Sequence, residues 1–192
     1  MRPFLLMLAF LGAFIIAAEP ASARDKFLKS QGQQLHYREA GAYANSAEKR
    51  DIMVGVEVLA KAEQKRLLGG RPDKSIPLEV AISNNSRFRL YINAISLVDS
   101  ARGNHLQILS LDDVARNVGP SGSGNKKSMR LSILRNNLTD KSLQAKVVLP
   151  GETIQGLVFV PKKKYRPGLE FHLDVQNLKR LVYLDITVPM GQ

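Results

Sequence analysis

The sequence predicts an all-β protein built as an antiparallel β-sandwich, and three observations support this prediction. Short runs that alternate apolar and polar residues recur about every ten residues. Asn, Ser, Gly and Pro residues, which favour turns, separate these runs. Helical periodicity is scarce, and strands do not alternate with helices as they do in parallel α/β folds. Because alternation buries one face of each strand, two sheets are expected to close around one core.

The N-terminus is typical of a secretory signal peptide. Arg2 precedes an apolar run at residues 4–18, and Ala21-Ser22-Ala23 follows with the small residues that signal peptidase recognises. The apolar run is shorter than the about 20 residues of a membrane span. We therefore expect residues 1–23 to be removed by cleavage after Ala23, and the mature chain to be periplasmic or secreted without a transmembrane segment. The alternative is that the leader remains as an N-terminal anchor.

The first part of the mature chain has a mixed character. Residues 24–50 are polar and carry Gln-rich and Ala/Gly-rich patches, which predicts a flexible N-terminal arm. The sandwich domain is expected to span residues 51–192. Its first strand is indicated at residues 52–60, where β-branched residues recur with a period of two. Residues 61–68 permit a helix, which the following Gly-Gly-Arg-Pro would end.

The clearest alternation lies in the middle of the chain. Residues 78–83 and 88–98 predict two strands joined by a turn at Asn84-Asn85-Ser86. Residues 105–109 predict a further short strand. Ser110 is followed by Asp113 in the third position, a pattern that resembles a capping box and opens one or two helical turns through Arg116. This is the one short helical insert of the predicted fold.

The second half of the chain begins with linker chemistry. Residues 119–125 are rich in Gly and Ser, and residues 129–149 hold two weaker apolar runs. Three further segments are strand-like: 153–160, 169–175 and 181–189. Gly156 interrupts the alternation in the first of these strands, which suggests a β-bulge. The last strand is expected to lie at an edge of a sheet.

Four segments taken together suggest a known layout. Residues 80–86 form a strand that runs into an Asn/Ser turn, and residues 95–99 form a strand that ends in an acidic turn. Residues 109–114 look like a short helical insert, and residues 150–159 like the penultimate hairpin. Over residues 52–189 this layout resembles a broad set of bacterial exported proteins and lipoproteins built as one immunoglobulin-like β-sandwich. The resemblance implies that fold and an exported compartment, and it implies no functional residues.

The composition and motifs argue against several chemistries. Cysteine is absent, which excludes disulfides, thiol nucleophiles, cysteine-ligated metals and a lipid anchor on cysteine. His36, His105 and His172 lie far apart without metal-ligand spacing, and no nucleophile motif such as Gly-x-Ser-x-Gly occurs. We therefore expect no enzyme, no cofactor and no metal. The remaining enzyme hypothesis is a hydrolase whose pocket gathers His105 or His172 with a carboxylate.

Positive charge is the unusual property of this chain. It has 28 basic and 17 acidic residues and a net charge of +11. Seven basic residues are candidates for binding an anion or a partner: Lys162, Lys163, Lys164, Arg166, Lys126, Lys127 and Arg130. Nucleic acid is not an expected partner, because the chain is exported and has no Trp and few aromatic residues to stack on bases. A solubilising surface without a ligand remains the alternative.

Two hypotheses for function follow from these observations. The first is a non-catalytic interaction module of the periplasm or cell envelope that meets a protein partner through loops and the sheet edge at residues 181–189. The second is a binder of anionic lipid or glycan through the basic loop at residues 162–166. High salt would weaken the second mode of binding and largely spare the first.

Overall fold

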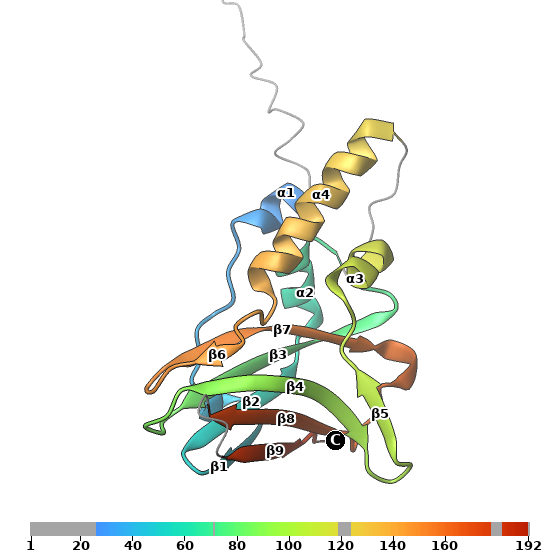
Figure 1. Ribbon diagram of the computed structural model, residues 1–192. Helices are drawn as coiled ribbons and strands as arrows, with labels where there is room; N and C mark the ends of the chain where they lie inside the picture. The colour runs from blue at the N-terminus through green and yellow to red at the C-terminus, as the bar shows by residue number, and fades with distance from the viewer. Residues whose placement is uncertain (1–25, 71, 119–123, 178–181, 192) are drawn as a thin grey trace, which may run out of the picture.

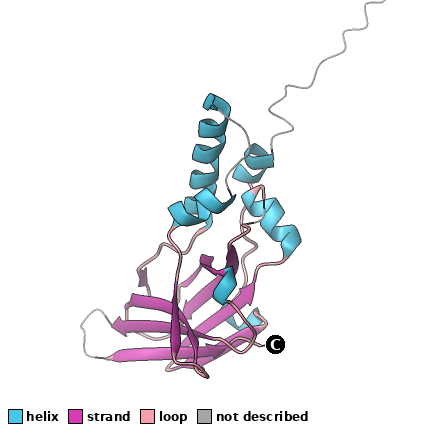
Figure 2. Cartoon of the chain, turned by 90° about the vertical axis from the view of Figure 1, so that its right-hand side faces the viewer, coloured by secondary structure: helices cyan, strands magenta, loops and turns pink. Residues whose placement is uncertain are grey.

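The computed structural model describes residues 26–70, 72–118, 124–177 and 182–191, and it consists of two antiparallel sheets with helices on one side (Figures 1 and 2). The predicted signal peptide at residues 1–23 lies outside the described residues. No helix among the described residues is long and apolar enough to cross a membrane. The prediction of a mostly β protein with a sandwich-like pair of antiparallel sheets is confirmed.

Each sheet joins strands from both halves of the chain. The first sheet has the order β1-β2-β3-β7, with strands Asn45–Lys49, Ile52–Val58, Ser75–Asn84 and Thr153–Pro161. The second has the order β5-β4-β8-β9, with strands Asn104–Gln107, Leu90–Asp99, Glu170–Asn177 and Tyr183–Pro189. The short strand β6, Val147–Val148, also pairs with β4. The predicted strands match these elements within a few residues at their ends.

The main core lies between the two sheets and follows from the period of two. Val54, Val56 and Val80 of the first sheet are fully buried against Phe171 and Leu173 of the second. Alternating residues point to the same face of a strand, so one register buries all of them together. The intervening residues of β8, from Glu170 to Gln176, stay partly exposed on the outer face of the second sheet.

The helices form a layer on the first sheet, on the face that points away from the second sheet (Figure 2). They are α1, α2, α3 and α4, at Lys26–Gln31, Lys61–Leu68, Leu111–Val118 and Gly124–Lys141, with short 3-10 turns η2 at Ala40–Ala42 and η3 at Lys162–Lys164. Leu157 and Phe159 of β7 point into this layer, whereas Val158 and Val160 point into the sandwich. Strand β7 is therefore buried on both faces.

The sequence predicted one short helical insert, and this prediction is wrong because the structure contains further helices. Helix α3 is that insert, and Ser110 caps it, because its hydroxyl accepts the N–H of Asp113 at 3.2 Å and donates to the carboxylate of Asp113 at 2.7 Å. Helix α4 is an additional and longer helix within the region of weaker apolar runs. Its buried residues Leu134 and Leu138 are four apart and pack in the helical core. Of the predicted linker, residues 119–123 lie outside the described part, and Gly124 begins α4.

The N-terminal segment also differs from its prediction. In place of a flexible arm at residues 24–50, the described part from residue 26 is built into the fold. Phe27 of α1 is buried in the helical core, and Tyr43 is buried against the outer face of the first sheet. Strand β1 pairs with β2 from Asn45 to Lys49, so the predicted domain boundary at residue 51 falls inside a hairpin.

Gly156 does not form the predicted bulge. The register between β3 and β7 is unbroken from Ser75 opposite Pro161 to Ser83 opposite Thr153. The glycine instead allows another segment to approach, since a Cβ at this position would lie 2.4 Å from the backbone nitrogen of Leu143. The irregularity in the sheets lies in β4, where the register shifts between Ile92 and Ala94.

A buried lysine near the end of α4 provides a test of the helical layer. Lys141 is 2% exposed, and its Nζ has no hydrogen-bond partner among the described residues. Burial lowers the pKa of this amine below its ordinary value. We expect Lys141→Met to raise the free energy of unfolding at neutral pH by about 1–2 kcal/mol, because burying an unpaired charge is costly.

The pH dependence of this gain has a definite sign. A folded-state pKa below the unfolded value means that the unfolded chain binds more protons, so stability increases as pH rises toward the ordinary lysine pKa. Chemical denaturation should therefore show the advantage of Lys141→Met shrinking under alkaline conditions. Lys127→Met, on the exposed part of the same helix, is the control and should change little. An advantage that is absent or independent of pH would contradict the assignment.

Candidate functional site

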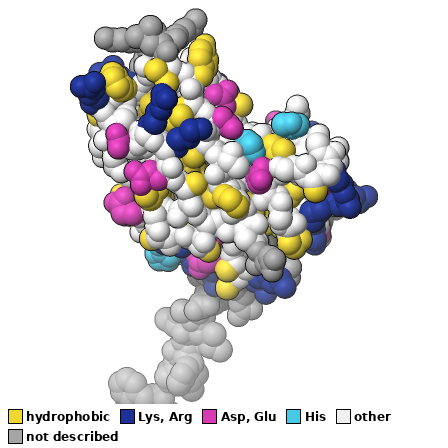
Figure 3. All heavy atoms as spheres, turned by 90° about the horizontal axis from the view of Figure 1, so that it is seen from below, with side chains coloured by type: hydrophobic (Ala, Val, Ile, Leu, Met, Phe, Trp, Pro, Cys, Tyr) yellow, Lys and Arg dark blue, Asp and Glu magenta, His cyan; other side chains and the backbone are white. Residues whose placement is uncertain are grey.

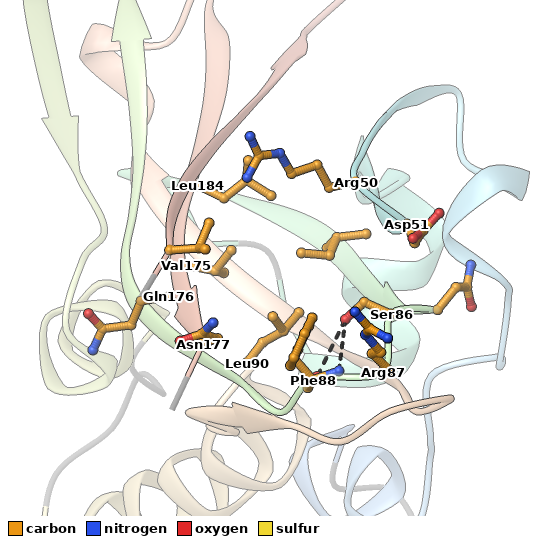
Figure 4. Close-up of a pocket in the computed structure, with 13 residues that line it drawn as sticks. Arg50, Asp51, Ser86, Arg87, Phe88, Leu90, Val175, Gln176, Asn177 and Leu184 are labelled. Atoms are coloured by element: carbon orange, nitrogen blue, oxygen red, sulfur yellow. Dashed lines mark hydrogen bonds between the residues drawn. The ribbon is translucent and has the colours of Figure 1, made fainter. Parts of the chain in front are cut away.

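A cavity of about 740 Å³, lined by described residues, lies at one end of the sandwich (Figure 4). Three turns or strand ends meet there: the β1–β2 turn, the β3–β4 turn, and the end of β8 with the start of β9. Its lining residues are Arg50, Asp51, Ile52, Asn85, Ser86, Arg87, Phe88, Leu90, Val175, Gln176, Asn177, Val182 and Leu184. This volume is within the about 300–1,000 Å³ usual for ligand sites.

The interior of the cavity is apolar. Ile52, Leu90, Val175 and Leu184 are buried residues of the main core, and they also line the cavity. In Figure 4, Phe88 lies beside Leu90 and faces the same space as Val175 and Leu184. Phe88 nevertheless remains 44% exposed. The core therefore continues into an open hollow, which suits an apolar ligand group.

The rim of the cavity has an excess of positive charge, with Arg50 and Arg87 against Asp51. Arg50 and Arg87 are exposed, and neither forms an ion pair with an acidic residue in the described part of the chain. The guanidinium of Arg87 lies 5.2 Å from the centre of the Phe88 ring. In Figure 4, the side chain of Arg50 points from its turn toward the side of the cavity that Leu184 lines. An anionic group at the mouth would meet two available guanidinium groups.

A fully buried asparagine holds the β3–β4 turn in place. The side-chain amide of Asn84 donates to the carbonyl of Phe88 at 2.7 Å and to that of Val148 at 3.1 Å. Its oxygen accepts the backbone N–H of Ser86 at 3.1 Å and the hydroxyl of Ser86 at 2.6 Å. The predicted Asn84-Asn85-Ser86 turn therefore positions Phe88 and Arg87 through specific hydrogen bonds.

The β1–β2 turn has an unusual backbone. Arg50 and Asp51 have positive φ angles of 51° and 63°, as a two-residue type I′ hairpin turn requires. Such positions usually hold Gly, Asn or Asp, so Arg50 is the residue that is strained there. The strained turn keeps Arg50 at the rim of the cavity.

The predicted basic loop lies at the opposite end of the sandwich. Strand β7 starts beside Ser83, near the cavity, and ends beside Ser75, where Lys162 to Lys164 follow as η3. All three lysines are exposed, and Arg166 is also exposed, with its Nε 3.7 Å from the carboxylate of Asp99. Lys164 and Arg166 line a smaller hollow of about 280 Å³ together with His105. An anion-binding role for this loop stays a prediction.

The remaining predicted basic residues lie elsewhere. Lys127 and Arg130 belong to the N-terminal half of α4, and the side chain of Lys126 lies outside the described part of the structure. This end of α4 points away from the sheets, whereas η3 follows β7 at the end of the first sheet (Figure 1). The seven candidates therefore do not form one patch. Seen from below, Lys and Arg side chains lie in several separate groups (Figure 3).

His172 is the histidine with carboxylate neighbours. It lies on the outer face of β8, as its alternation predicts, with Nε2 3.3 Å from Glu170 and Nδ1 3.3 Å from Asp185. The hydroxyl of Ser100 donates to the carboxylate of Glu170 and not to the imidazole of His172, so Ser100 and His172 do not form a nucleophile–imidazole pair. This hydrogen bond, followed by that with His172, lowers the pKa of Glu170. No cluster of His, Asp and Glu among the described residues could hold a metal ion.

The sequence did not reveal the cavity. Its apolar residues come from β2, β4, β8 and β9, and each one alone is an ordinary core position of an alternating strand. The available signals were the arginines in two turns and the aromatic Phe88 directly after the Asn/Ser turn. These residues could be assigned to the rim of a cavity only after the structure showed that the ends of these strands meet.

Comparisons with known proteins give only distant structural similarity. No protein-family model and no curated protein matches the sequence. The chain is similar to the yjhA protein of Bacillus subtilis, with a TM-score of 0.45, 9% identity, and coverage of 78% of this chain and 98% of that one. It is also similar to a functionally unknown protein of Listeria monocytogenes, with a TM-score of 0.38, 15% identity, and coverage of 76% and 80%.

Proposed function

We propose that this chain is an exported, non-catalytic binding protein, and that its ligand is an amphiphile with an acyl chain and an anionic head group. The observation that supports this proposal is that an apolar cavity and two arginines lie together at one end of the sandwich. An apolar cavity of about 740 Å³ opens beside Arg50 and Arg87. The cavity matches an acyl chain by its apolar lining, and the guanidinium groups match a carboxylate or phosphate.

We propose further that the sandwich is immunoglobulin-like. The order of its strands supports this, since β2-β3-β7 corresponds to the A-B-E sheet of that fold. The order β5-β4-β8-β9 corresponds in the same way to a C-F-G sheet with one strand added beside C. On this assignment, the helices α3 and α4 are an insertion before strand E.

The hypothesis of a protein partner on the edge of β9 has less support. Strand β9 ends the second sheet, but β1 lies alongside it. The Nζ of Lys49 donates to the carbonyl of Asp185 at 2.7 Å, and the N–H of Gly191 donates to the side chain of Asn45 at 2.7 Å. A strand added at this edge would compete with these contacts. An envelope protein partner therefore remains only a proposal.

Titration calorimetry with dodecanoate and dodecanol tests the proposed ligand class. We expect the protein to bind both, and the double variant Arg50→Ser/Arg87→Ser to weaken dodecanoate binding about tenfold while sparing dodecanol. Val182→Trp, at a partly exposed lining position, should fill the cavity and weaken both ligands. The control is Lys162→Ser/Lys163→Ser at the opposite end, which should bind as the unmodified protein does. Unchanged binding by Val182→Trp would overturn the proposal.

A further inference from the structure

The end of the sandwich that holds the cavity also gathers most of the exposed apolar side chains. Of eight large hydrophobic residues exposed in the described part of the chain, five lie there. They are Phe88, Val147, Leu149, Val182 and Tyr183. The strand registers bring them together, because Leu90 lies opposite both Val148 and Asn177, and Gln176 lies opposite Tyr183. Exposed apolar residues that gather at one end of a molecule in this way suggest an interaction surface.

Basic residues surround this apolar surface. Arg50 and Arg87 line the cavity, Arg89 directly precedes Leu90, and Lys146 directly precedes Val147. The acidic residues nearby are Glu48, Asp51 and Glu152, together with Asp174 and Asp185 two residues further along β8 and β9. The carboxylate of Glu152 accepts the N–H of Leu149 at 2.7 Å. The positive excess lies at the β1–β2 and β3–β4 turns, where Arg50, Arg87 and Arg89 outnumber Asp51.

We infer that this end of the sandwich docks on the surface of an anionic lipid bilayer. Aromatic and aliphatic side chains flanked by Arg and Lys suit the membrane interface, where apolar groups enter the acyl boundary and cations meet anionic head groups. The cavity opens on the same surface, so an acyl chain could pass into it from the leaflet. The inference goes beyond the proposed function, because surface binding does not require an occupied cavity.

Vesicle flotation tests this surface directly. The probe is the unmodified protein with vesicles of phosphatidylglycerol and phosphatidylcholine, or of phosphatidylcholine alone. We expect flotation with the anionic vesicles, and a partition coefficient that falls as salt is added. The double variant Arg87→Ser/Arg89→Ser should lower the partition coefficient about fivefold for each charge removed. Phe88→Ser/Tyr183→Ser should also lower it, although the charge is unchanged.

The opposite end of the molecule supplies the matched control. The variant Lys162→Ser/Lys163→Ser/Lys164→Ser/Arg166→Ser loses more charge but lies far from the proposed surface. We expect it to bind vesicles more strongly than Arg87→Ser/Arg89→Ser does. Weaker binding by the loop variant, equal binding to uncharged vesicles, or no flotation would each overturn the inference. The last result, together with intact dodecanoate binding, would leave the amphiphile cavity standing and favour a protein as the partner of this surface.

Discussion

Replacing Arg38 by methionine is expected to lower the free energy of unfolding by about 2–3 kcal/mol, because it leaves a buried carboxylate without its cation. The guanidinium of Arg38 donates to both carboxylate oxygens of Glu57, at 2.6 and 3.1 Å, and lies 3.2 Å from the carboxylate of Glu79. The side chain of Glu79 is only 8% exposed. This expected loss of about 2–3 kcal/mol is small for a broken buried ion pair. The reason is that the side chain of Arg38 is 30% exposed, so water screens part of the interaction.

The same network fastens the N-terminal segment to the first sheet. Glu79 also accepts hydrogen bonds from the hydroxyl of Tyr43 at 3.1 Å and from the amide of Gln155 at 2.6 Å. The guanidinium of Arg38 lies 4.0 Å from the centre of the Tyr43 ring. Burial, and then the neighbouring Glu79 carboxylate, raise the pKa of Tyr43, so its hydroxyl stays a donor well above neutral pH. Removing Arg38 therefore weakens several contacts together.

Urea denaturation of three variants measures this effect. Arg38→Met should lower the midpoint strongly, and Arg38→Met/Glu79→Gln should recover part of the loss because the unpaired charge is gone. Arg116→Met is the control, since it breaks a surface pair with Asp113 in which both side chains are about half exposed or more. We expect the control to change the free energy by less than about 1 kcal/mol. Equal losses for Arg38→Met and Arg116→Met would show that the network does not stabilise the fold.

The substitution Gly156→Ala is expected to cost about 3 kcal/mol, because the new methyl group would overlap a neighbouring backbone. Its Cβ would lie 2.4 Å from the nitrogen and 2.5 Å from the Cα of Leu143. The N–H of Leu143 donates to the carbonyl of Leu157 at 3.0 Å, and Ser142 forms a parallel bridge with the same residue. Backbone cannot rotate away as a side chain can, so the segment after α4 would have to leave the edge of β7.

Thermal or chemical unfolding of the purified variant checks this expectation. Gly32→Ala is the matched control, since nothing lies within 4 Å of its added Cβ. The control should change the free energy of unfolding by no more than about 0.5 kcal/mol. A Gly156→Ala protein as stable as the Gly32→Ala protein would mean that the segment at Leu143 yields easily and that its contact with β7 contributes little.

Local patterns predicted the strands well and the N-terminal segment poorly. The alternation at β3 was correct, but its outward residues Glu79, Ala81 and Ser83 are buried rather than solvated. The N-terminal segment covers Ala81 by packing and Glu79 through hydrogen bonds and an ion pair. A segment that packs through polar groups has no apolar periodicity, so its composition resembled that of a flexible arm. Its place depends on partners that are distant in sequence.

Helix α4 shows a related difficulty. Its buried residues Ile133, Leu134 and Leu138 stand among many polar ones, and its first residues are Gly and Asn. Neither feature favours a helix in isolation. Contacts with α1 and α3 supply the missing stabilisation. Among them is the side-chain amide of Asn137, which donates to the carbonyl of Phe27 at 3.2 Å and to the hydroxyl of Ser30 at 2.7 Å. Tertiary packing thus outweighed local propensity.

The sequence by itself determined which residues lie between the sheets, since a period of two admits only one face toward the core and the register then follows. It also indicated the Asn84 turn and the Ser110 cap, because each contains hydrogen bonds between groups within four residues of one another, although Asn84 also donates to the distant carbonyl of Val148. Only the tertiary structure decided that the basic candidates at residues 162–166 lie at the opposite end from the cavity. Only the tertiary structure places Arg50 and Arg87 beside residues of four core strands around one cavity. A cavity depends on how the ends of distant strands meet, so no single segment of the sequence can predict it.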